Sequence, residues 1–239
     1  MKRHLFGTSL ASLAITVAAH GGTFVEEFLP TTDLGSGIDS SKIYTHAIDW
    51  GSDAADPGGP GADVNGVHFT EGTFGDFPAL NYSFFGPDLT FQDNPSNNYD
   101  GGSGMFDLTD DFLFTGTIGT GVQTLTLTGL IGGATYTITH YQSAGWNGAL
   151  QILDGDDDGL GFNTGTFDRG DPGSPRAIHY TYTQALGDTD FVMTFDPEND
   201  VDSFHHYAFT NEVVALPEPA SITLFGLAAF GLLARRRRS

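Results

Sequence analysis

The sequence has no cysteine among its 239 residues and very few basic residues. The missing cysteine excludes disulfide bonds, thiol catalysis and cysteine-ligated zinc. Six of the nine lysines and arginines stand close to the two ends, so residues 20–215 hold only Lys42, Arg169 and Arg176 against 29 acidic residues, a net charge of −26. Such a surface repels nucleic acid and anionic lipid and attracts cations. We therefore expect no nucleic-acid partner.

Amphipathic patterns with the period of a helix are almost absent, and 33 glycines favour strands joined by long turns. Apolar and polar residues alternate instead, as in half-buried strands. The predicted strands cover residues 43–50, 66–70, 80–84, 122–128, 134–141, 149–153, 178–182, 191–195 and 204–214. A further short strand is expected around Phe112 and Phe114, with Met105-Phe106 as a candidate for it, and Asn65-Gly66 predicts a tight hairpin turn. These elements predict an all-β protein, with an antiparallel β-sandwich of jelly-roll type over residues 20–215.

The first 19 residues have the three parts of a signal peptide. A basic start, Met1 to His4, is followed by an uncharged apolar run from Leu5 to Val17 and then by the small residues Ala18 and Ala19. We therefore expect export, with cleavage after Ala19 and residues 1–19 removed.

Residues 216–239 combine a proline motif, an apolar run and a basic end. Pro217, Glu218 and Pro219 precede an uncharged run from Ala220 to Ala234, and Arg235, Arg236, Arg237 and Arg238 follow it. Fifteen residues of helix span about 22 Å, a short transmembrane helix. The arginines mark its cytoplasmic end. The physical pattern alone therefore predicts a C-terminal helix anchored in the inner membrane.

The order of these three parts resembles the PEP-CTERM sorting signal of Gram-negative bacteria. In that family an exosortase, a membrane cysteine transpeptidase or protease, is thought to recognise the Pro-Glu-Pro motif and remove the helix. The resemblance implies an exosortase partner and a cell-surface or extracellular destination after processing. Without an exosortase the tail would remain a plain membrane anchor.

A second resemblance covers some fifteen residues in the middle of the chain. Leu125 to Leu130 read Leu-Thr-Leu-Thr-Gly-Leu, and Gly133 and Tyr136 follow. This pattern is similar to a hairpin of secreted β-sandwiches, found in galactose-binding-like jelly rolls and in fibronectin type III modules. It implies a sandwich corner and no particular activity, and the length of residues 20–215 favours one larger jelly roll.

An acidic loop suggests a bound cation. Asp154, Asp156 and Asp158 stand at positions 1, 3 and 5 of a calcium-loop pattern, and Gly159 occupies the turn position. Position 12 is Gly165 where the EF-hand pattern has glutamate, and no helices flank the loop. We expect either a structural Ca²⁺ site, the one cofactor that the sequence suggests, or a solvated acidic turn.

No pattern identifies a catalytic residue. His205 and His206 are neighbours in a predicted strand, so their side chains point to opposite faces and are expected to be surface and packing residues. Gly102-Ser103-Gly104 lacks the surroundings of a nucleophile elbow. Carboxylates are too numerous for any two to be chosen as a glycosidase pair. We therefore expect a protein that is not an enzyme.

Two aromatic residues suggest a ligand. Tyr141 and Trp146 belong to a stretch with polar and glycine residues that follows a predicted strand, and sugar rings stack on such side chains. The alternative is a tryptophan that caps the core. The sequence thus predicts an exported, non-catalytic surface or extracellular-matrix protein. The alternatives are a carbohydrate-binding module for polysaccharide and, third, a polysaccharide-acting enzyme.

Overall fold

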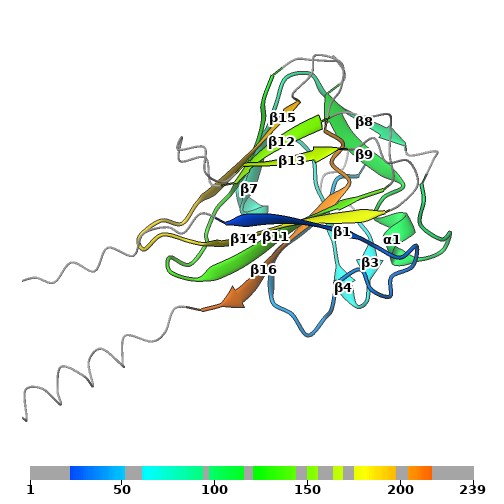
Figure 1. Cartoon of the computed structure of the whole chain (residues 1–239), viewed down its shortest axis with the longest axis horizontal. Helices are drawn as coiled ribbons and strands as arrows, with labels where there is room; N and C mark the ends of the chain where they lie inside the picture. The colour runs from blue at the N-terminus through cyan, green and yellow to red at the C-terminus, as the bar shows by residue number, and fades with distance from the viewer. Residues whose placement is uncertain are drawn as a thin grey trace, which may run out of the picture.

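In the computed structural model the described strands form two facing six-stranded sheets and two small strand pairs (Figure 1). The structure describes residues 22–51, 61–93, 97–115, 121–143, 150–155, 164–168, 175–197 and 204–216. Within these residues no helix is long and apolar enough to cross a lipid bilayer. The apolar run predicted as the sorting helix lies outside them.

The first sheet has six strands in the order β1-β14-β11-β16-β2-β5. Their bounds are Thr23–Phe28 for β1, Arg176–Thr183 for β14, Thr135–Gln142 for β11, Ala208–Ala215 for β16, Tyr44–Asp49 for β2 and Thr70–Glu71 for β5. Neighbours in this sheet run antiparallel, except that β2 and β5 are parallel.

The second sheet has six antiparallel strands in the order β13-β12-β15-β10-β7-β6. Their bounds are Thr164–Asp168, Leu150–Gly155, Phe191–Pro197, Gln123–Leu127, Tyr82–Phe85 and Gly75–Phe77. Two small pairs join β3 (Asp63–Val64) to β4 (Val67–His68) and β8 (Leu89–Asp93) to β9 (Asp111–Thr115). The short helices are η1 (Pro78–Leu80) and α1 (Gly104–Asp107).

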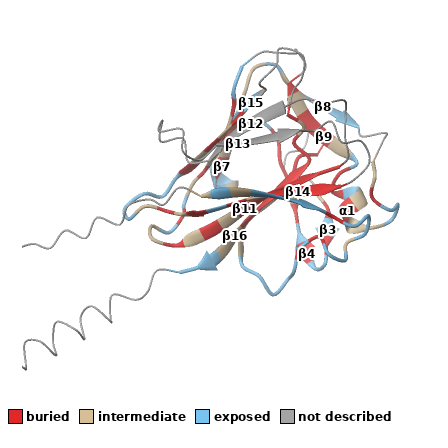
Figure 2. Ribbon diagram, in the orientation of Figure 1, coloured by how far each residue is buried: buried red, intermediate tan, exposed pale blue. Residues whose placement is uncertain are grey.

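The main core fills the space between the two sheets. Strand alternation sends every second residue inward from both layers. Many of the side chains that meet there are aromatic. Trp50 is fully buried in this core, with its ring against Phe84 of the second sheet and Phe209 of the first. Figure 2 shows buried residues gathered along the central strands, whereas β1 at the sheet edge is largely exposed.

A second, smaller core lies on the other face of the first sheet. Tyr141, Ala177 and Ala208 point outward from three neighbouring strands, and the segment after β1, the β3–β4 pair and α1 cover them. The predicted Asn65-Gly66 turn is confirmed, since both residues have the positive φ of a tight hairpin turn between β3 and β4. This cover leaves only part of the outer face open.

The predicted alternation is confirmed where it was clearest. Leu125 and Leu127 are buried in β10, and Tyr136, Ile138 and His140 are buried in β11. The expected hairpin between these strands is wrong, because β10 belongs to the second sheet and β11 to the first. Residues 128–134 therefore form a corner between the sheets, where the Tyr136 hydroxyl accepts a hydrogen bond from the Ile131 amide at 2.8 Å.

The prediction of strand for Met105-Phe106 is also wrong. Both residues lie in α1, where the Ser103 hydroxyl accepts a hydrogen bond from the Phe106 amide at 3.0 Å and caps the helix. The Asp33 carboxylate accepts two more bonds, from the Gly104 and Met105 amides. The cap at Ser103 thus stabilises a helical turn here, and alternation of apolar and polar residues does not reveal such a cap.

Candidate functional site

The open part of the first sheet's outer face is a polar surface. Alternation along β11 sends Thr137, Thr139 and Tyr141 outward. Thr137 bonds Thr181 on β14 at 2.8 Å, and Thr139 bonds the Nδ1 atom of His179 at 2.9 Å. On the other side β16 places Thr210 beside Thr139 and Glu212 beside Thr137. Three strands distant in sequence therefore present hydroxyl, imidazole and carboxylate groups together.

A β-bulge adds an aromatic ring to this surface. His46 lies opposite Asn211, but Tyr44 lies opposite Glu212, so Thr45 is the extra residue on β2. The Thr45 hydroxyl donates to the Asn211 carbonyl at 3.2 Å and accepts from the Asn211 amide group at 2.9 Å. The bulge turns Tyr44, which is half-buried, to the same face as Glu212.

The segment between β1 and β2 supplies one wall. Asn65 holds this segment in place, since its side-chain amide donates to the carbonyls of Asp33 at 2.9 Å and Ile38 at 3.0 Å. Ser36 and Gly37 stand between these two anchor points, and Gly37 has a left-handed backbone (φ 76°). The hairpin turn thus positions the wall over the sheet.

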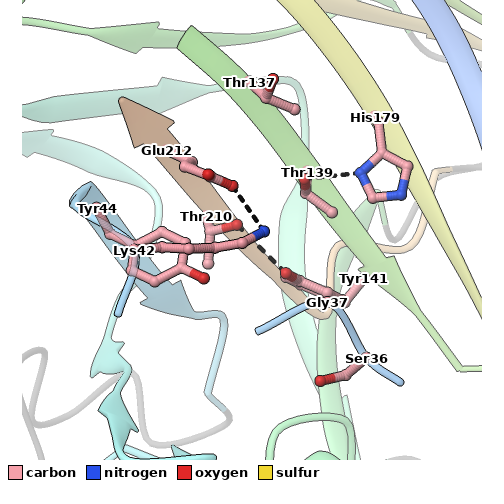
Figure 3. Close-up of a pocket in the computed structure, with 10 residues that line it drawn as sticks. All are labelled: Ser36, Gly37, Lys42, Tyr44, Thr137, Thr139, Tyr141, His179, Thr210 and Glu212. Carbon is pink, nitrogen blue, oxygen red and sulfur yellow. Dashed lines mark hydrogen bonds and ion pairs between the residues drawn. The ribbon is translucent and has the colours of Figure 1, made fainter. Parts of the chain in front are cut away.

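Together these groups enclose a cavity of about 120 Å³ (Figure 3). It is lined by Ser36, Gly37, Lys42, Tyr44, Thr137, Thr139, Tyr141, His179, Thr210 and Glu212. Hydroxyl groups both donate and accept hydrogen bonds, so the lining can bond polar groups of a ligand in addition to the pairs described above.

The charges of the cavity cancel one another. The Lys42 ammonium lies 2.9 Å from a Glu212 carboxylate oxygen. Partial burial lowers the pKa of Lys42, but the hydrogen bond and charge of Glu212 outweigh it and leave that pKa above its usual value. Burial lowers the pKa of His179 despite the Glu27 carboxylate 3.4 Å away, so this imidazole is neutral at pH 7. The cavity is polar and nearly uncharged.

A second group of titratable residues lies at the edge of the same sheet. Asp49 and Glu71 are opposite one another in the parallel pair of β2 and β5, and both are buried. Burial, and then the charges of Asp111, Asp110 and Glu71, raise the pKa of Asp49 well above its usual value, although the Ala62 amide donates a bond to it. Among the residues that the structure describes, its buried Oδ1 atom has no hydrogen-bond partner. Burial and the neighbouring Asp111 raise the pKa of Asp110 to about 6. In the described part of the chain, no three acidic or histidine side chains are placed to hold a metal ion.

The predicted calcium loop falls mostly outside the described residues. The structure extends β12 to Gly155, so the backbone of Asp154 lies within the strand, opposite Thr164 and Thr194. Asp156 and Asp158 lie outside the described residues, as do Trp146, the Pro217-Glu218-Pro219 motif and the arginines at 235–238. Calcium binding at Asp154 stays a prediction.

Tyr141, predicted as a glycan contact, does line the cavity, but the residue is only 2% exposed. Its ring packs edge-on against Phe69, and its hydroxyl lies 3.3 Å from the Thr210 hydroxyl. Ligand contact by Tyr141 stays a prediction. Trp50 belongs to the main core, and the predicted packing role of His206 is confirmed, since its ring lies against Phe84, Phe195 and Phe204.

Sequence reasoning missed most of the cavity. Lys42, Tyr44 and Glu212 carry no motif, and only the rarity of basic residues could have drawn attention to Lys42. Asp49 and Glu71 are 22 positions apart and meet only through a parallel strand pair. No local sequence pattern predicts such a strand pairing.

Comparison with known proteins identifies the tail. Residues 215–238 match the PEP-CTERM protein-sorting motif. The match starts at the last residue of β16 and includes both the Pro-Glu-Pro motif and the four arginines. The predicted sorting signal is thereby confirmed, and it indicates export through the cell envelope. The match says nothing about the sandwich itself, and no curated protein matches the chain.

Three solved structures have some similarity to the chain. Two are crystal structures of an exo-β-1,3-galactanase from Phanerochaete chrysosporium with β-1,3-galactotriose, at 13% and 12% identity and a TM-score of 0.33. Each covers 62% of this chain, which spans only 31% of the galactanase chain. The third describes carbohydrate-binding modules of the β-sandwich superfamily, at 10% identity and a TM-score of 0.15, covering 58% of this chain and 66% of that one. Similarities this low carry no argument about activity.

Proposed function

We propose that this chain is an exported, non-catalytic β-sandwich protein of the cell surface or extracellular matrix, delivered there through its C-terminal sorting signal. The observation that carries the proposal is the PEP-CTERM match at residues 215–238, which begins at the last residue of β16, the final described strand of the sandwich. The basic and apolar start at residues 1–19 supports it as a signal peptide. The sandwich, of jelly-roll type, is then the part that works outside the cell.

In this proposal the tail holds the chain in the inner membrane until an exosortase acts at the Pro-Glu-Pro motif. The four arginines keep the C-terminal end on the cytoplasmic side. Processing releases the sandwich from the apolar helix, and its strongly negative surface keeps it soluble in a medium of high ionic strength.

The test is cell fractionation in the native host. We expect the wild-type protein mainly at the cell surface or in the medium, and the triple variant Pro217→Ala, Glu218→Ala, Pro219→Ala mainly in the membrane fraction with its tail intact. Ser221→Ala, just outside the motif, serves as the control and should behave as wild type. Equal distribution of the triple variant and the wild type would contradict recognition of the motif.

A second candidate function is binding of polysaccharide at the cavity on the first sheet. The observation that favours it is the lining of hydroxyl groups on the outer face of the first sheet, beside the half-buried ring of Tyr44, which packs against the second core. Sugar hydroxyls match such donors and acceptors. The sandwich would then hold the protein on a glycan of the matrix.

Calorimetric titration with a panel of oligosaccharides tests this second function. Thr137→Val keeps the shape of the side chain but removes one lining hydroxyl, and loss of one hydrogen bond of about 1.4 kcal/mol weakens binding about tenfold. Thr183→Val is the matched control, because Thr183 lies on the same face but outside the cavity, paired with Thr135 at 3.0 Å. Equal affinities of the two variants would place the ligand elsewhere.

A further inference from the structure

The cavity contains one positive and one negative side chain, and the two form an ion pair with each other. Lys42 and Glu212 come from positions 170 apart in the chain, yet their charged atoms lie 2.9 Å apart at the cavity wall (Figure 3). Lys42 is one of only three basic residues between positions 20 and 215. Of the other two, Arg169 lies outside the described residues, and Arg176 forms an ion pair with Glu26 at 2.6 Å.

From this arrangement we infer that the cavity selects uncharged sugars over acidic ones, and that Glu212 is the residue that determines this specificity. The inference rests on the proposed binding of polysaccharide at the cavity. It concerns glycans without carboxylate or sulfate groups, against uronic-acid or sulfated glycans.

The first argument is competition for the cation. A sugar carboxylate could bind Lys42 only by displacing Glu212, whose side chain is 23% exposed. The displaced carboxylate would then stay partly buried without its partner, which is unfavourable. A neutral sugar leaves the pair intact and uses the hydroxyls of Thr137, Thr210 and Tyr44 around it.

The second argument is the field of the whole protein. With 29 acidic and 3 basic residues between positions 20 and 215, the surface repels any polyanion that approaches. The neutral imidazole of His179 adds no positive charge to the cavity. The short-range pairing and the long-range repulsion therefore act in the same direction.

The experiment compares ligands that share a sugar backbone and differ in whether the carboxyl group is charged or methylated. Oligogalacturonate and its methyl ester are titrated, at constant ionic strength, within a panel of neutral and acidic oligosaccharides. For wild type we expect binding to neutral members of the panel and at least tenfold weaker binding to acidic ones. For Glu212→Gln, which removes the carboxylate paired with Lys42, we expect the ratio of acidic-ligand affinity to neutral-ligand affinity to rise at least tenfold.

Two further variants make the result specific. Glu27→Gln changes the net charge by the same amount beside His179, but leaves the pair of Lys42 and Glu212 in place, so no gain for acidic ligands is expected. Adding Lys42→Met to Glu212→Gln should abolish the gain. Thermal unfolding checks that each variant is folded.

Each outcome has a distinct meaning. A wild type that prefers acidic sugars, or equal gains in Glu212→Gln and Glu27→Gln, overturns the inference and leaves binding at the cavity standing. Failure of the folded wild type to bind any member of the panel overturns the proposed polysaccharide binding, and the inference falls with it.

Discussion

Replacing Trp50 by alanine is expected to lower the free energy of unfolding by about 3–5 kcal/mol, the usual result of removing a large buried aromatic side chain. Trp50 is fully buried and touches rings from both layers of the sandwich, Phe84 in the second sheet and Phe209 in the first. Its loss would leave a cavity where the sheets meet. Chemical denaturation of the isolated sandwich, monitored by circular dichroism, measures the change.

Two comparisons make the Trp50 result specific. Trp50→Phe should lose less stability than Trp50→Ala, because a phenyl ring still fills part of the space and the buried Nε1 atom, which has no hydrogen-bond partner in the described part of the chain, is removed. Leu34→Ala should have almost no effect, since Leu34 is 83% exposed. A loss for Trp50→Ala as small as that for Leu34→Ala would mean that the sheets do not pack through this residue.

The second large effect concerns pH. Asp49→Asn is expected to stabilise the protein at neutral pH by on the order of 2 kcal/mol, because it removes a carboxyl that burial keeps from ionising. The pKa of Asp49 in the folded state lies above its value in the unfolded chain. Well below the unfolded pKa of about 3.9 the carboxyl is protonated in both states and contributes no difference. As pH rises, the unfolded state ionises first, so wild-type stability falls until the folded pKa is passed.

Unfolding measured from pH 3 to pH 8 checks this expectation. The stability advantage of Asp49→Asn should be small near pH 3 and grow toward neutral pH, because burial and the charges of Asp111, Asp110 and Glu71 hold the pKa of Asp49 above its unfolded value. Asp188→Asn, at an exposed turn, is the control and should track the wild type. A difference between Asp49→Asn and wild type that does not change with pH would contradict the raised pKa.

Strand positions were predictable from the sequence where burial is one-sided. In β11, one face packs on the main core and the other carries threonines, so alternation gave both the strand and its inward residues, Tyr136 and Ile138. Edge strand β1 was missed, since most of its residues are exposed and no alternation of burial marks it. Alternation of apolar and polar residues reflects burial of one face of a strand, so it does not identify a strand that is exposed on both faces.

Long-range pairing was not predictable in the same way. The corner motif at 125–136 indicates a change of direction, but it does not say whether the two strands pair or enter opposite sheets. The cavity depends on the register of β16 against both β11 and β2, and on the bulge at Thr45 that turns Tyr44 outward. One residue without a ladder partner thus decides a feature of the site, and no sequence pattern marked it.

The tail was predictable because its information is local. The proline motif, the apolar run and the arginines follow one another within residues 216–239, so their meaning does not depend on tertiary structure. The same tail carries the central claim, that the sandwich is exported and separated from its membrane segment.

The most direct test of that claim is the intact mass of the protein isolated from its native host, measured in the surface and membrane fractions. The account predicts a surface species that lacks residues 1–19 and the apolar run with its four arginines. A protein found only in the membrane fraction, at the mass of residues 20–239, would contradict sorting and make the tail a permanent anchor.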